Sequence, residues 1–169
     1  SFRLLLVSNQ IRPGEEDRSP IRRALIEKIP DGVKPLPTPI NFEDKIELVA
    51  WRTTPTVPRP GSPLSIELFW RAKKRVSGDW KIFVHIDSAG QRIHGDHAPV
   101  EGLLPTSDWK VGDLVRDEHH LNVKRTIAPG RFTFYVGLYR GNTRMKIRNS
   151  ERHLKDNENR AKIGQLWVR

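Results

Sequence analysis

Apolar and polar residues alternate with a period of two through much of this chain, and this constrains its fold more than any other feature. The pattern is clearest in LSIELFWRA (64–72), WKIFVHID (80–87) and RFTFYVGLY (131–139). Successive side chains of a β-strand point to opposite faces, so each segment predicts a strand with one buried face. In the second segment the face expected to be buried carries Trp80, Ile82, Val84 and Ile86.

Further strands are expected in DKIELVAW (44–51), LVRDEHHLNV (114–123) and KIGQLWV (162–168). Turn-forming segments separate the strands: PRPGSP, SAGQ, APGR and RGNT. Many short strands with frequent proline and glycine turns and little helix predict an all-β fold. We therefore expect an antiparallel β-sandwich, jelly-roll or immunoglobulin-like, over residues 41–169.

Residues 1–40 are predicted to be a lead-in to this domain. Ser19 and Pro20 are typical of a helix start, which predicts a short helix over 21–29. PDGVKPLPTP (30–39) predicts an extended linker, because each proline disfavours helix. FRLLLV (2–7) is too short to span a membrane and lacks the layout of a signal peptide. The chain starts at Ser1, so we expect a processed chain or a piece of a longer one.

Charge is distributed unevenly along the sequence, which carries a net charge of +10. Residues 85–120 hold five of the six histidines and seven acidic groups, whereas residues 121–169 hold twelve basic and three acidic groups. The basic third is either a solvated surface or a face that attracts polyanions such as acidic polysaccharide, anionic lipid or nucleic acid. The chain has no cysteine, which excludes thiol nucleophiles, cysteine-bound zinc and disulfides.

Histidines and aspartates gather around a predicted hairpin with its tip at Gly90. His85 and Asp87 are two apart on one strand and share a face. Together with His94 and Asp96 on the returning side they form a candidate metal site, the alternative being solvated or hydrogen-bonded side chains. An enzyme interpretation would be a metal-dependent hydrolase or transferase using residues 85–120.

Other catalytic patterns are missing from the sequence. It contains no HExxH motif, EF-hand loop, GxSxG elbow or glycine-rich phosphate loop. None of its carboxylates is marked by sequence as protonated near neutral pH. We therefore predict a protein that is not an enzyme and needs no cofactor.

Residues 42–148 resemble the β-sandwich domain that follows the transmembrane part of many bacterial membrane glycosyltransferases. These are the protein-mannosyltransferase-like and aminoarabinose-transferase-like enzymes, which use lipid-linked sugars. The positions that carry the resemblance are Pro60-Gly61, Phe69-Trp70, Phe83-Val84-His85, Asp87, Gly90, Gly95-Asp96, Pro99, Gly102, Pro105-Thr106, Trp109, Gly112, Asp117, Pro129-Gly130 and Val136-Gly137-Leu138-Tyr139. Residues 1–40 and the His119-His120 pair lie outside this pattern.

The resemblance implies a periplasmic or extracytoplasmic accessory domain without catalytic machinery of its own, membrane-tethered in a longer protein. It also implies a role in an envelope glycan or polysaccharide system, with a glycan or an envelope protein as partner. The transferase residues and the lipid-sugar site belong to the membrane part, which this sequence does not contain.

Under the resemblance, GDHAPVEGLLPTSDW (95–109) becomes a long structured connection fixed by Trp109. Asp96, Asp108 and Asp117 would then cap turns or accept backbone N–H bonds. The alternative is a sugar-binding lip, in which Trp109 stacks on a sugar ring. The polar groups of that lip would be Asp96, His97, Asp108 and Arg116.

Tyr135 and Tyr139 share a predicted strand face and could supply a second aromatic platform. Their ordinary interpretation is partial burial with hydroxyls that reach water. Nucleic acid is not the expected partner, because RGNTRMKIRNSERHLKD (140–156) is basic but has no aromatic residue for stacking. An anionic membrane surface or envelope polymer fits the same charge.

Overall fold

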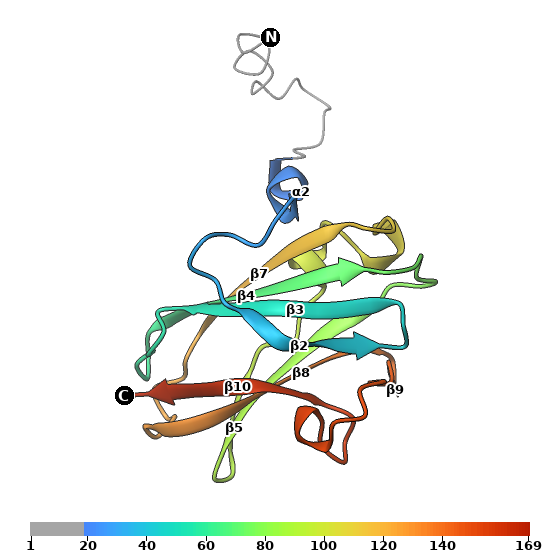
Figure 1. Cartoon of the computed structure of the whole chain (residues 1–169). Helices are drawn as coiled ribbons and strands as arrows, with labels where there is room; N and C mark the ends of the chain where they lie inside the picture. The colour runs from blue at the N-terminus through green and yellow to red at the C-terminus, as the bar shows by residue number, and fades with distance from the viewer. Residues whose placement is uncertain (1–18) are drawn as a thin grey trace, which may run out of the picture.

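A computed structural model describes residues 19–169 as two antiparallel sheets packed face to face (Figure 1). The first sheet has the strand order β1-β7-β4-β3-β2, and the second has the order β10-β8-β5-β6 with β9 paired to β8. The strands are β1 (Leu25–Ile26), β2 (Pro35–Phe42), β3 (Ile46–Thr54), β4 (Pro63–Ala72), β5 (Lys81–Ser88), β6 (Gln91–His94), β7 (Leu114–Asn122), β8 (Gly130–Arg140), β9 (Thr143–Arg144) and β10 (Ala161–Val168). The predicted all-β sandwich is confirmed.

The core lies between the sheets and is built from the faces that the period of two identified. Every second residue of β4, β5 and β8 is buried there, and large rings fill the middle: Phe42, Trp70, Trp109, Phe132 and Phe134. The predicted hairpin is also confirmed, because β5 and β6 join at Ala89-Gly90, where both residues have positive φ. Glycine adopts that conformation without strain.

The N-terminal part of the described chain differs from the expectation. Helix α2 spans only Ser19–Ala24, because Leu25 and Ile26 pair with β7 instead of continuing the predicted helix. Residues 35–39, expected to belong to the linker, are instead part of strand β2. Its prolines are tolerated because β2 lies at a sheet edge. The sandwich therefore begins before residue 41, and the predictions for residues 1–18 lie outside the described residues.

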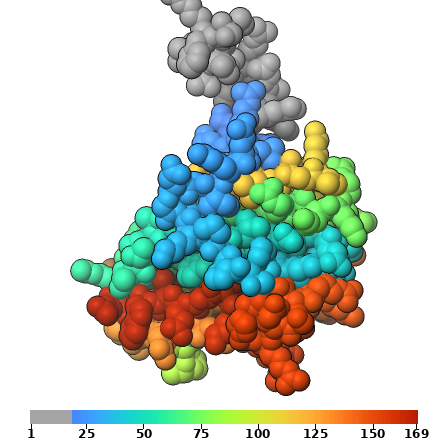
Figure 2. All heavy atoms as spheres, viewed as in Figure 1, coloured from blue at the N-terminus to red at the C-terminus, as the bar shows by residue number. Residues whose placement is uncertain are grey.

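Residues 26–33, from the end of β1 into the connection to β2, cover part of the outer face of the first sheet. Ile26, Ile29 and Val33 pack against Ala50 of β3 and Phe69 of β4. The space-filling view shows this N-terminal segment, in blue, lying over the strands of that sheet (Figure 2). The same face holds a buried carboxylate, Glu67, so part of this outer face is shielded from solvent.

The connection between β6 and β7 is structured as predicted. It contains two short 3-10 helices, η1 (Pro99–Gly102) and η2 (Thr106–Asp108), and a third, η3 (Arg152–Leu154), precedes β10. Trp109 ends the connection with 0% of its surface exposed, and its indole N–H donates to the carbonyl of Leu104 at 3.0 Å. Among residues 19–169 no helix is long and apolar enough to cross a membrane.

Candidate ligand-binding face

Polar side chains line up in rows across the outer face of the second sheet. The strand register places Gln165, Thr133, Asp87 and Arg92 in one row, taken from β10, β8, β5 and β6. The next row contains Tyr135, His85 and His94. Directly paired residues of an antiparallel sheet share a face, so the two rows form one surface.

These rows line a groove of about 630 Å³. Its walls are mostly polar: Asp87, Ser88, Ala89, Gly90, Gln91, Arg92, His94, Arg131, Thr133, Tyr135, Arg160 and Gln165. Most small-molecule pockets are lined predominantly by apolar side chains. The composition of this groove instead suits a ligand that is itself rich in hydrogen-bonding groups.

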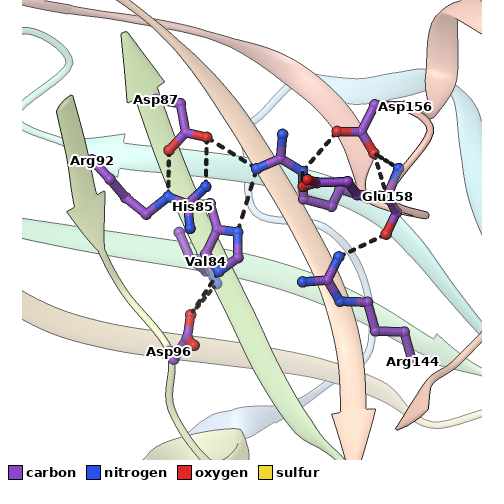
Figure 3. A network of polar contacts seen from close by, with 9 residues as sticks. Val84, His85, Asp87, Arg92, Asp96, Arg144, Asp156 and Glu158 are labelled. Carbon is purple, nitrogen blue, oxygen red and sulfur yellow. Dashed lines mark hydrogen bonds and ion pairs between the residues drawn. The ribbon is translucent and has the colours of Figure 1, made fainter. Parts of the chain in front are cut away.

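Asp87 belongs to a network of ion pairs and hydrogen bonds among residues that line the groove (Figure 3). Arg92 donates two hydrogen bonds to its carboxylate, at 2.7 and 2.9 Å, and Arg160 donates a third at 3.0 Å. Burial alone would raise the pKa of Asp87, but the hydrogen bonds from the two arginines outweigh it and lower the pKa. Asp87 therefore stays ionised near neutral pH, in a fixed bidentate geometry.

Arg160 is nearly buried, and it joins the floor of the groove to the segment before β10. Its guanidinium lies 3.9 Å from the centre of the Tyr135 ring, and its Nε donates to Asp156 at 2.7 Å. Glu158 lies 3.3 Å from the same nitrogen. An arginine held by three carboxylates and one ring has a defined orientation, which also fixes the Tyr135 ring.

His85 lines a second hollow on the same face and contacts Arg160 of the groove. Its Nδ1 lies 3.4 Å from Arg160 Nη1, which is a donor, so this ring nitrogen carries no proton. Burial and then the positive charge of Arg92 lower the pKa of His85. The ring is therefore a neutral imidazole near neutral pH.

The second hollow, of about 300 Å³, is lined by Phe83, His85, Asp96, Tyr139, Gly141, Asn142 and Arg144. The Phe83 ring rests on the backbone of Gly137, where a Cβ atom would come within 2.1 Å of it. The Arg144 guanidinium covers the other side of the ring, 4.6 Å from its centre. Asp96 and Tyr139, both expected from the sequence to bind ligand, thus meet here, whereas Tyr135 lines the larger groove.

The residues that suggested a metal site are not brought together as a set of ligands. The described residues contain no group of three or more His, Asp or Glu side chains placed to hold a metal ion. Asp87 faces two arginines, and His85 presents Nδ1 to one of them. Asp96 accepts the backbone N–H of Val84 at 3.0 Å, which is the structural role predicted for it.

The sugar-binding lip centred on Trp109 is also wrong, because a fully buried ring offers no face to a ligand. The other members do not converge: Arg116 binds Glu67 on the first sheet, and His97 is buried against Asp117. Asp108 is exposed to solvent. The predicted role of Asp117 is confirmed, because it accepts the N–H of Val100 at 2.7 Å.

His97 and Asp117 form a buried ion pair between the sheets. His97 Nε2 lies 2.6 Å from Asp117 Oδ2, and Nδ1 lies 2.7 Å from the carbonyl oxygen of Gly95. Both partners are acceptors, so both ring nitrogens donate and the ring is an imidazolium. Burial alone would lower the pKa of His97, but the bond to Asp117 raises it. His119 stacks on this ring at 4.1 Å and binds Glu101.

Several residues of the groove were missed from the sequence: Arg92, Arg131, Thr133, Arg160 and Gln165. Those on β8 could have been found, because Thr133 alternates with buried Phe132 and Phe134. Arg160 could not have been found from the sequence. It directly precedes β10, so its contacts with Asp87 and Tyr135 depend on how β10 pairs with β8.

No protein-family model matches this chain, and no curated protein matches it.

Proposed function

We propose that the protein is a non-catalytic, extracytoplasmic binding module that recognises a glycan on the outer face of its second sheet. The observation that carries the proposal is the polar groove across β6, β5, β8 and β10. It offers donors and acceptors side by side, from Arg92, Asp87, Thr133 and Gln165. Sugar hydroxyls both donate and accept, so they need such a mixture.

Rigidity of the groove supports the proposal. The ion pairs of Asp87 with Arg92 and Arg160 hold the charged groups in place before any ligand arrives. A site that is already ordered loses little side-chain entropy on binding. The Tyr135 ring is likewise held beneath Arg160, so its hydroxyl is directed by the fold.

The chemistry of the groove favours binding over catalysis. Glycoside hydrolysis needs one carboxylic acid that stays protonated near neutral pH and a second carboxylate beside it. Asp87 is the carboxylate that lines the groove, and its pKa is lowered by two arginines. It therefore cannot serve as the acid.

The place of the module in the cell is also a proposal. The similarity of residues 42–148 to the accessory domains of membrane glycosyltransferases supports a periplasmic position beside a glycan- or polysaccharide-handling membrane system. Buried Trp109 and Asp117, two positions of that similarity, have structural roles in the fold. This is what an accessory domain shared by different enzymes requires.

A groove-filling variant tests the proposal. Thr133→Phe places a ring in the middle of the groove, on a strand position that tolerates aromatics. Ser65→Phe is the matched control, because Ser65 occupies an outward position of β4 in the other sheet. Wild type and Ser65→Phe are expected to bind the same members of a glycan array, and Thr133→Phe is expected to lose them. Equal binding by all three proteins would exclude the groove.

A further inference from the structure

Trp167 and Arg131 lie next to each other on the outer face of the second sheet, beside the groove. They are direct partners in the register of β10 and β8, so their side chains share the outer face. Trp167 is 47% exposed, and it is the only Trp, Phe or Tyr of residues 19–169 that the structure leaves exposed. Burying a ring of that size is strongly favourable, so its position in solvent asks for an explanation.

The pair adjoins the groove. Arg131 lines it, and Thr133 follows two residues along β8, which is about 7 Å away at the usual rise of a strand. Gln165 stands in the same relation to Trp167 on β10. The ring and the guanidinium therefore extend the polar rows by one further row.

Arg131 differs from the other two arginines of the groove in its charge balance. Arg92 is paired with Asp87, and Arg160 with Asp87, Asp156 and Glu158. Within the described part of the chain the side chain of Arg131 makes no ion pair or hydrogen bond. The uncompensated positive charge among the groove's arginines thus lies beside the exposed ring, and Arg169, 5.6 Å from that ring's centre, adds another cation.

We propose that the ligand is an acidic glycan, whose anionic substituent pairs with Arg131 while the adjoining sugar ring stacks on Trp167. A guanidinium presents a planar fork of donors that matches carboxylate and phosphate oxygens. The net charge of +10 attracts such a polymer over a longer range. This inference rests on the proposed glycan-binding function and specifies the class of glycan.

The test compares matched ligands by isothermal titration calorimetry at fixed salt. One pair is oligogalacturonic acid and its methyl ester, and the other is a phosphorylated oligomannose and its dephosphorylated form. At least one acidic ligand is expected to bind about tenfold more tightly than its neutral partner, as one charge-assisted contact implies. Which pair shows the difference identifies carboxylate or phosphate as the group recognised.

Two variants assign the effect to residues. Arg131→Gln is expected to remove the preference for the acidic ligand, and Arg148→Gln, an exposed arginine outside both hollows, is expected to keep it. Trp167→Ala is expected to weaken acidic and neutral ligands by the same factor. Both positions are exposed, so the variants should fold.

The outcomes separate this inference from the function on which it rests. Equal affinity for acidic and neutral partners, or an unchanged preference in Arg131→Gln, would overturn the acidic-glycan inference but leave a glycan-binding groove. An unchanged affinity in Trp167→Ala would overturn the stacking. If Thr133→Phe binds every ligand as wild type does, the groove itself is wrong.

Discussion

The outer faces of the two sheets are built from the same kind of alternating strand but differ in their exposure to solvent. On the first sheet, outward residues such as Ala50 and Phe69 are apolar, and residues 26–33 of the chain cover them. On the second sheet, outward residues such as Asp87, Thr133 and Gln165 are polar, and a groove remains above them. The protein thus uses its own segment to bury part of one outer face and leaves the other open to solvent.

The difference extends to the buried ions. Glu67 on the covered face has 4% of its side chain exposed and binds Arg52 and Arg116, whereas Asp87 on the open face is 25% exposed. A carboxylate that lines an open groove can exchange one of its partners for a ligand, but a carboxylate shielded from solvent cannot do so readily. Charge pairing alone therefore does not identify a binding site; access does.

Truncating Phe69, on which residues 26–33 pack, should have the largest effect on the free energy of unfolding. Phe69→Ala is expected to lower the free energy of unfolding by about 3–5 kcal/mol, because a large buried ring leaves a cavity. Thr133→Ala, at an outward position of the open face, is expected to change it by less than about 0.5 kcal/mol. Urea denaturation of both variants measures the contrast. Similar losses in the two would mean that residues 26–33 do not seal the first sheet.

The His97–Asp117 ion pair should make the free energy of unfolding fall as the pH is raised above neutrality. His97→Gln is expected to cost about 3 kcal/mol at pH 6, because it leaves Asp117 buried without its cation. The pKa of His97 is raised in the folded state, so its contribution is complete below the unfolded value near 6.5 and is lost as pH rises through the folded pKa.

Urea denaturation from pH 5 to 9 is the measurement for this pair. Wild-type stability should fall above pH 6.5, and His97→Gln should show no such fall. His119, stacked on His97 and bound to Glu101, has a lowered pKa and so acts only below pH 6.5. Parallel curves for the two proteins above pH 6.5 would contradict the imidazolium.

The loss of stability on neutralising a carboxylate should also differ between the two faces, but by a smaller amount. Both Glu67 and Asp87 have lowered pKa values, so each stabilises the fold above its unfolded pKa near 4 and ceases to do so as pH falls through the folded value. Glu67→Gln is expected to cost about 2 kcal/mol at pH 7, and Asp87→Asn about 1 kcal/mol. Thermal melts at pH 7 and pH 3 check both, since the costs should shrink at pH 3. A larger loss for Asp87→Asn would reverse the comparison.

Period-two alternation was enough to predict the sandwich, the hairpin at Gly90 and the buried face of each long strand. It was not enough for α2, since Leu25 and Ile26 extend a good helical pattern but gain more by pairing with β7. Nor could local pattern separate the two kinds of aromatic residue. Trp109 looks like a loop residue and is buried, whereas Trp167 looks like a core residue and is exposed.

Of the two tryptophans, the exposure of Trp167 could more easily have been predicted from the sequence. Gln165 and Trp167 are two apart, so they must share a face, and a glutamine on that face indicates solvent. A bulge between Lys162 and Gly164 hides the pattern, because it shifts the alternation at the start of β10. The pairing of Trp167 with Arg131, on which the acidic-glycan inference depends, required the register itself.

The His97–Asp117 pair has a consequence for where such a module can work. The backbone of His97 pairs with Ile82 of the second sheet, while its side chain holds β7 of the first, so the two sheets are clasped without a covalent bond. Extracytoplasmic domains often secure such contacts with disulfides. This chain has no cysteine, and its contact between the sheets requires only that His97 be protonated. This contact can therefore form without an oxidant or a disulfide isomerase, and reducing surroundings will not break it.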